Sequence, residues 1–140
     1  MELHTNLTEN FKLSEFVESR FFGEYQEKVI KTFSEDTSLL ENTKVLAKQL
    51  QALRDELQKP VRLNISYRPL WWEKMKGRSG NSQHILGKAA DIAVSGVSTK
   101  QVAETIERLI KEGKMLDGGL GVYNSFVHYD IGRAGRRWKG

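Results

Sequence analysis

Residues 82–91, with the sequence Ser-Gln-His-Ile-Leu-Gly-Lys-Ala-Ala-Asp, and residues 126–130, Phe-Val-His-Tyr-Asp, decide how this chain folds and what it binds. The chain has only three histidines, and His84 and His128 lie in these two segments. With Asp91 they offer three ligands to one Zn²⁺ and leave a fourth position for water. This ligand count is typical of a catalytic rather than a structural zinc site, so the two segments predict a metallohydrolase.

Short β-strands are expected to hold these side chains in place. The alternation of apolar and polar residues predicts strands at residues 89–94, 119–123 and 126–131, the last two joined by a tight turn at residues 124–125. Side chains alternate along a strand, so Asp91 faces away from the apolar residues beside it, and His128 and Asp130 share a face. His84 enters from the loop before Asp91, and Gly87 allows the chain to turn back so that both reach one ion.

A further strand and a long loop precede the first segment. Residues 61–68 alternate between apolar and polar side chains, as in a half-buried strand, and place Ser66 and Arg68 on the polar face. Residues 69–83 contain two tryptophans, two glycines and several cations, and are expected to form a long irregular loop. Trp71 and the tryptophan after it then form either one wall of a groove or part of the core.

Helices are expected in the rest of the chain. They are predicted from about Ser14, over residues 39–58 after a capping box at Ser38, and over residues 98–112 after Ser98. The side chains that the first helix is expected to bury are Phe16, Val17 and Phe21. The order of elements predicts an α+β fold in which helices pack mainly on one side of an antiparallel sheet. The chain length predicts a single domain over residues 1–140.

Composition limits the classes of function. Hydrophobic residues make up 39% and charged residues 29% of the chain, and no apolar run approaches the ~20 residues of a spanning helix, so no membrane insertion is expected. The net charge of +4 favours anionic partners, but no motif for binding nucleic acid appears, and none is expected as a partner. The lack of cysteine restricts any metal site to His, Asp and Glu. A monomer is expected, and residues 1–6 lack the pattern of a signal peptide.

The first segment resembles the zinc motif of the M15 peptidases, Ser-x-His-x-x-Gly-x-Ala-x-Asp, with all five positions matched. Flanking blocks that also resemble this family are residues 10–16, 66–69, 119–123 and 126–130, the last followed by Arg137 and Trp138. The family contains D-alanyl-D-alanine carboxypeptidases and peptidoglycan endopeptidases, and it shares a fold with the hedgehog signalling domain. The resemblance therefore implies a hedgehog/DD-peptidase-like fold and peptidoglycan peptides as substrate.

The resemblance also implies roles for individual residues. His84, Asp91 and His128 match the zinc ligands, for one Zn²⁺ per chain. Arg68 matches the arginine that binds substrate and stabilises the developing oxyanion, a task that suits a planar guanidinium. The other residues expected to contact substrate are Ser66, Ser82 and Trp71.

One position departs from the family pattern. Several members carry an acid three residues before the last zinc histidine as the general base, and here that position is Ser125. A serine does not accept a proton from water at neutral pH. Asp130 is the nearest carboxylate, and it is expected either to be the general base or to orient a zinc histidine. Glu73 in the predicted loop is the remaining candidate for the base.

The expected function is zinc-dependent hydrolysis of peptide bonds in peptidoglycan stem peptides or cross-links, by a carboxypeptidase or an endopeptidase of the phage-lysin kind. Two alternatives stay open. One is a hedgehog-like zinc-binding module without turnover, which Ser125 favours, and the other is a phage adhesion domain that holds cell wall in a basic groove. The protein is expected to act at the bacterial cell wall, in the periplasm or outside the cell, or to be made in the cytoplasm of a phage host.

Overall fold

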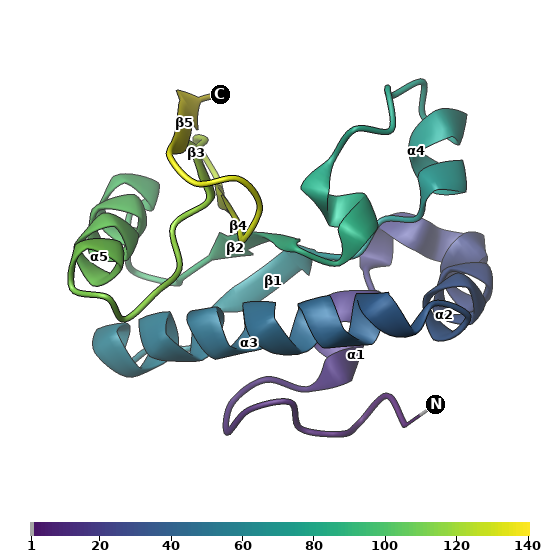
Figure 1. Ribbon diagram of the computed structural model, residues 1–140, viewed down its shortest axis with the longest axis horizontal. Helices are drawn as coiled ribbons and strands as arrows, with labels where there is room; N and C mark the ends of the chain where they lie inside the picture. The colour runs from purple at the N-terminus through teal and green to yellow at the C-terminus, as the bar shows by residue number, and fades with distance from the viewer. Residues whose placement is uncertain (1) are drawn as a thin grey trace.

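A five-stranded β-sheet lies at the centre of the computed structural model, which describes residues 2–140 (Figure 1). Its strands are β1 (Arg62–Ile65), β2 (Ala89–Ala93), β3 (Gly119–Val122), β4 (Val127–Asp130) and β5 (Arg136–Lys139). They lie in the order β1-β2-β4-β3-β5, and all pairs are antiparallel except β3 and β5. Met1, which is part of the predicted domain of residues 1–140, lies outside the described residues.

The predicted α+β fold is confirmed, and so are the three strands around the histidine motifs. β2 pairs with β4, with Asp91 directly opposite His128. β3 and β4 form the predicted hairpin, which is closed by a hydrogen bond from the Tyr123 amide to the Phe126 carbonyl at 3.0 Å. No sequence pattern predicts β5, because Arg-Arg-Trp-Lys lacks apolar alternation. Its pairing with β3 makes it a strand, and this one parallel pair corrects the expectation of a fully antiparallel sheet.

Helices and short 3₁₀ turns surround this sheet. They are α1 (Leu13–Val17), η1 (Arg20–Tyr25), α2 (Gln26–Ser34), α3 (Thr37–Leu57), α4 (Leu70–Met75), η2 (Gln83–Leu86) and α5 (Thr99–Lys111). α3 runs beneath β1 and β2 across the lower part of the molecule (Figure 1). α5 begins with the predicted capping box at Ser98. Within residues 2–140, no helix is both long enough and apolar enough to span a membrane.

The alternation along β2 separates a core face from a site face. Ile92 is fully buried in one cluster with Leu50 of α3 and Ile106 of α5. Full burial of a side chain of this size contributes about 1.5–3 kcal/mol. Asp91 points to the opposite face, away from both helices. The apolar face therefore sets the register of the sheet, and the register places Asp91 opposite His128.

Two details of the helices differ from expectation. Asp36, and not Ser38, is the N-cap of α3, and its carboxylate accepts a hydrogen bond from the Ser38 amide at 3.0 Å. Phe16 and Val17 are buried as predicted, but Phe21 is 52% exposed. The reason is that α1 ends after one turn, and Phe21 belongs to the separate turn η1.

The segment predicted as an irregular loop, residues 69–83, contains the helix α4. Pro69 precedes it in an extended conformation, and its ring suits the position at which a helix begins. Trp72 of α4 is buried and packs edge-to-face on Phe22, with ring centroids 5.1 Å apart. This packing stabilises α4 through residues distant in sequence, which a local pattern does not show.

An irregularity in β1 changes which side chains face outward. The pairing of β1 with β2 shifts between Leu63 and Ile65, so the strict alternation predicted for residues 61–68 ends there. Ser66 is 2% exposed, and its hydroxyl donates to the Ala89 carbonyl at 2.7 Å. Ser66 is therefore tied to β2 and does not lie on an open polar face.

Candidate metal centre

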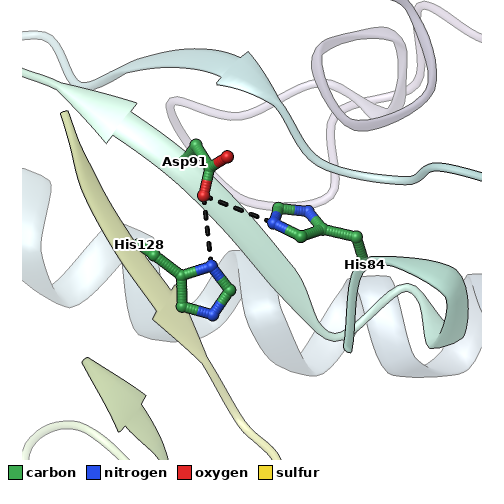
Figure 2. A group of neighbouring side chains, drawn as sticks. All are labelled: His84, Asp91 and His128. Atoms are coloured by element: carbon green, nitrogen blue, oxygen red, sulfur yellow. Dashed lines mark hydrogen bonds and ion pairs between the residues drawn. The ribbon is translucent and has the colours of Figure 1, made fainter. Parts of the chain in front are cut away.

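Three elements bring His84, Asp91 and His128 together (Figure 2). His84 lies in η2, where the Ser82 hydroxyl accepts a hydrogen bond from the His84 amide at 3.1 Å. Gly87 follows with a φ of 70°, a left-handed conformation that leads the chain into β2 and Asp91. His128 lies on β4, directly opposite Asp91. The three side chains predicted as metal ligands therefore meet at one place in the fold.

One carboxylate oxygen of Asp91 lies between the two histidine rings. Its Oδ1 is 3.3 Å from Nε2 of His84 and 3.1 Å from Nδ1 of His128. Ligand atoms about 2.0–2.2 Å from a tetrahedral zinc are about 3.3 Å from one another, so these separations suit a shared ion. One candidate ligand atom from each residue lies within 4.8 Å of the others. The second Asp91 oxygen points away from both rings in Figure 2.

The outer nitrogen of each ring is held by an acceptor. Nδ1 of His84 donates to the Ser66 carbonyl at 2.7 Å, and Nε2 of His128 donates to Asp130 at 2.7 Å. A carbonyl and an ionised carboxylate only accept, so these nitrogens carry the ring protons. When both rings are neutral, as metal ligation requires, the inner nitrogens present lone pairs to the same position as the Asp91 carboxylate. Three electron-rich atoms then converge on one position, which a cation can occupy.

The electrostatics of the group also favour a positive charge at its centre. Burial lowers the pKa of His84, so that its ring is neutral. Burial alone would raise the pKa of Asp91, but hydrogen bonds with His128 and His84 hold it well below its usual range. Burial lowers the pKa of His128, but hydrogen bonds with Asp130 and Asp91 outweigh this effect and raise it above its ordinary value. The two carboxylates therefore attract a cation, a proton or a metal ion, to this position.

Asp130 is buried behind His128 and does not line the cavity that contains the three predicted metal ligands. It is 0% exposed, and its Oδ1 accepts hydrogen bonds from the amides of Gly119 and Gly132 at 3.0 and 2.9 Å and from the Arg136 guanidinium. Burial would raise its pKa, but the hydrogen bonds with His128 and Arg136 hold it well below its usual range. This burial and these hydrogen bonds argue against the predicted role of Asp130 as general base. Its position suits the alternative role, which is to orient His128.

Arg68 lies beside His84, Asp91 and His128, here called the metal group, in a cavity of about 300 Å³. Its Nη2 donates to the Ser82 hydroxyl at 3.4 Å, and its Nε forms an ion pair with Glu73 at 3.2 Å, without hydrogen-bond geometry. Burial lowers the pKa of Arg68. The guanidinium nevertheless stays charged, because the ordinary pKa of an arginine is far above neutral pH. The Glu73 side chain is 1% exposed and also pairs with Arg78 at 2.8 Å. This burial and pairing argue against Glu73 as the general base.

The residues predicted to contact substrate fall into two groups. Ser82 and Arg68 line the cavity together with the metal group. Ser66 does not, because it is buried beneath the site, where its carbonyl holds a histidine of the metal group. Trp71 faces α2, and its Nε1 donates to the Thr32 hydroxyl at 2.9 Å. These positions argue against the predicted substrate contacts of Ser66 and Trp71.

Three aromatic side chains complete the cavity: Tyr123, Phe126 and Trp138. They lie in the blocks that resemble the M15 family, but none of them is among the predicted site residues. Trp138 reaches across from β5, with its ring centroid 5.0 Å from that of His128 and its Nε1 donating to Tyr123 at 2.9 Å. Gly121 of β3 lies between His128 and Trp138 and is paired with both. A glycine inside a strand often marks the close approach of another group, and Gly121 is the signal in the sequence that points to this arrangement.

Gly121→Ala is expected to destabilise the cavity wall that Trp138 forms. A methyl group at this position overlaps the indole ring, so the variant should lose about 1–3 kcal/mol of unfolding free energy, the usual cost of overpacking. Chemical denaturation measures the loss. In a Trp138→Ala background the same substitution should cost much less, because the overlap is gone. Equal costs in the two backgrounds would mean that the damage lies elsewhere.

Comparisons with known proteins agree with this geometry. The family model described as Peptidase M15 matches residues 13–130. The chain is also similar to a probable peptidoglycan L,D-endopeptidase, MepK, of Haemophilus influenzae, with 39% identity over 67 residues. The aligned part is 46% of this chain and 32% of the relative, so the chain covers about a third of the relative's length. Because the family match extends over most of the chain and includes the whole metal group, the chain belongs to the peptidase M15 family.

Proposed function

We propose that this protein is a zinc-dependent peptidase that hydrolyses peptide bonds in peptidoglycan, with one Zn²⁺ per chain. The observation that carries the proposal is the convergence of Nε2 of His84, Nδ1 of His128 and Oδ1 of Asp91, while both outer ring nitrogens are already bonded. Two neutral imidazoles and one carboxylate suit zinc and leave a coordination position open. Membership of the M15 family, and a relative named as a probable peptidoglycan endopeptidase, support the substrate class.

The residues around the metal group have separable tasks. His84, Asp91 and His128 would hold the zinc ion, which would supply Lewis acidity to activate water and polarise the carbonyl of the peptide bond. The Ser66 carbonyl fixes the ring of His84, and the Asp130 carboxylate fixes the ring of His128. Arg68 faces the same cavity, where its guanidinium binds negative charge that develops on the carbonyl oxygen.

The shape of the site favours an endopeptidase over a carboxypeptidase. Two hollows of about 300 and 490 Å³ share Arg68, Asp91 and Phe126. The smaller hollow extends to Trp138 on β5, and the larger one extends to α4. In Figure 1, α4 and the edge strand β5 lie on either side of β2, and both lie on the side away from α3. A peptide therefore has room to continue on both sides of the metal group, as a cut within a stem peptide or cross-link requires.

Digestion of purified muropeptides tests this proposal. Zinc-loaded protein should convert cross-linked dimers to monomers or cut within the stem peptide. A chelator should stop the reaction, and one equivalent of Zn²⁺ should restore it. Release of terminal D-alanine alone would instead assign a carboxypeptidase. Activity that persists in the chelator would contradict the zinc-dependent mechanism.

A zinc-binding module without turnover is the second candidate, and one observation favours it. Ser125, at the position of the general base in several family members, is exposed and lines the groove. Among the described residues, Asp91 is the only carboxylate that lines either hollow. Retention of one equivalent of zinc with no change in any muropeptide would select this candidate.

A further inference from the structure

The larger hollow beside the metal group is strongly cationic. Four basic side chains line it: Arg20, Arg68, Lys76 and Arg78. Among the described residues that line it, Asp91 is the only carboxylate, and it belongs to the metal group. Among the described residues that line the smaller hollow, Arg68 is the only lysine or arginine, and the others are Ser82, the three residues of the metal group and three aromatic side chains. We propose that the larger hollow, here called the cationic arm, is a subsite for a substrate carboxylate on one side of the scissile bond, and that Arg20, Lys76 and Arg78 select it.

Arg20 and Lys76 are held in place without losing their charge. Within residues 2–140, neither forms an ion pair with a carboxylate. The Arg20 guanidinium lies 5.2 Å from the centroid of the Phe21 ring, and Nζ of Lys76 lies 4.5 Å from that of Trp72. A cation–π contact orients a cation but does not neutralise it. Both charges are therefore available to an anion in the cationic arm.

Glu73 sets two further cations side by side. Its buried carboxylate lies 3.2 Å from Nε of Arg68 and 2.8 Å from Nη1 of Arg78. One carboxylate between two guanidiniums leaves a net positive charge. The Arg78 side chain is 50% exposed, so the donors that Glu73 does not use remain open to the hollow. A guanidinium fixed in this way is suited to bind a carboxylate through paired hydrogen bonds.

The two hollows together form a groove through the site, and its positive charge is concentrated at one end, in the cationic arm. A carboxylate is attracted to the cationic arm, whereas an amide loses that attraction and an amine is repelled. A peptide with a free carboxylate on one side of the cut is thus bound in one orientation. The inference rests on the proposed peptidase function, because it names which chemical form of the peptide the same site prefers.

Three forms of one synthetic peptide cross-link test the subsite. One form keeps free carboxylates on both sides of the scissile bond, and each of the others has the carboxylate on one side converted to an amide. One of the two amides should lower kcat/KM about tenfold, the size of one charge-assisted hydrogen bond. The other should lower it less than about twofold, because only one arm is cationic.

The double variant Arg20→Gln/Lys76→Gln should abolish the preference for the acid over the sensitive amide. The matched control Lys48→Gln/Lys111→Gln removes the same charge from exposed positions on α3 and α5, and should keep the preference. Equal loss with both amides, or a preference that persists in the Arg20/Lys76 variant, would overturn the subsite while the peptidase function stands. If no form is cleaved, the peptidase function fails. The subsite is then tested by calorimetric binding of the same peptides to the zinc-loaded protein, where equal affinities would overturn it.

Discussion

Asp91→Asn is expected to lower the affinity for zinc by roughly 10³-fold, since zinc-binding free energies of about 10–16 kcal/mol are shared among few ligands. The Asp91 Oδ1 is the atom that both histidine rings approach, and asparagine keeps its size but not its charge. Competition with a chromophoric chelator measures the affinity. Muropeptide digestion at limiting zinc should show no product. The variant lacks the negative charge of Asp91, which contacts the rings of both His84 and His128.

A matched carboxylate on the surface serves as the control for Asp91→Asn. Glu104→Gln removes the same charge from an exposed position of α5, outside both hollows of the groove, and should leave zinc binding unchanged. Thermal unfolding gives a second measurement, because zinc at a thousand times its Kd stabilises the folded state by about 4 kcal/mol. This gain should be present in Glu104→Gln and absent in Asp91→Asn. Zinc stabilisation of equal size in both variants would mean that the ligands lie elsewhere.

Asp130→Asn is expected to weaken zinc binding by about 10–100-fold, the usual effect of removing a group that orients a ligand histidine. It should also lower the unfolding free energy by about 2 kcal/mol. That is less than the loss of a fully buried ion pair, because the Arg136 side chain is 25% exposed to solvent. Activity should return in part when zinc is saturating. An undiminished zinc affinity with no turnover would instead identify Asp130 as the proton acceptor.

Asp117→Asn is the matched control for this second variant. Asp117 also accepts from an arginine, Arg137, at 2.8 Å, but the pair is half-exposed and does not contact the metal group. Loss of this pair should cost less than about 1 kcal/mol, as for a surface ion pair. Its zinc affinity should equal that of the wild type. A fall in affinity in both variants would show that the effect comes from general loosening of β3 and its neighbours.

The parts of the fold that the sequence predicts well are those with strong local periodicity. Alternation in residues 89–94 correctly separates Asp91 from the apolar Ile92, because a strand turns successive side chains to opposite faces whatever it pairs with. The same reasoning places His128 and Asp130 on one face of β4. The helix α4 and the strand β5 escape prediction because each depends on contacts with distant segments, on Phe22 for α4 and on β3 for β5.

The sequence by itself identified the three residues that the structure brings together as a candidate metal group: the types and spacing of His84, Asp91 and His128 need only two strands and a turn to bring them together. Only the tertiary structure decided what lies behind and beside them. A period of two assigns Asp130 to the face of His128, but it does not show that the neighbouring strand buries this carboxylate. Burial and pairing depend on all segments that fold against a residue. For this reason the proposed orienting role of Asp130 and the cations beside the metal group emerge only from the folded chain.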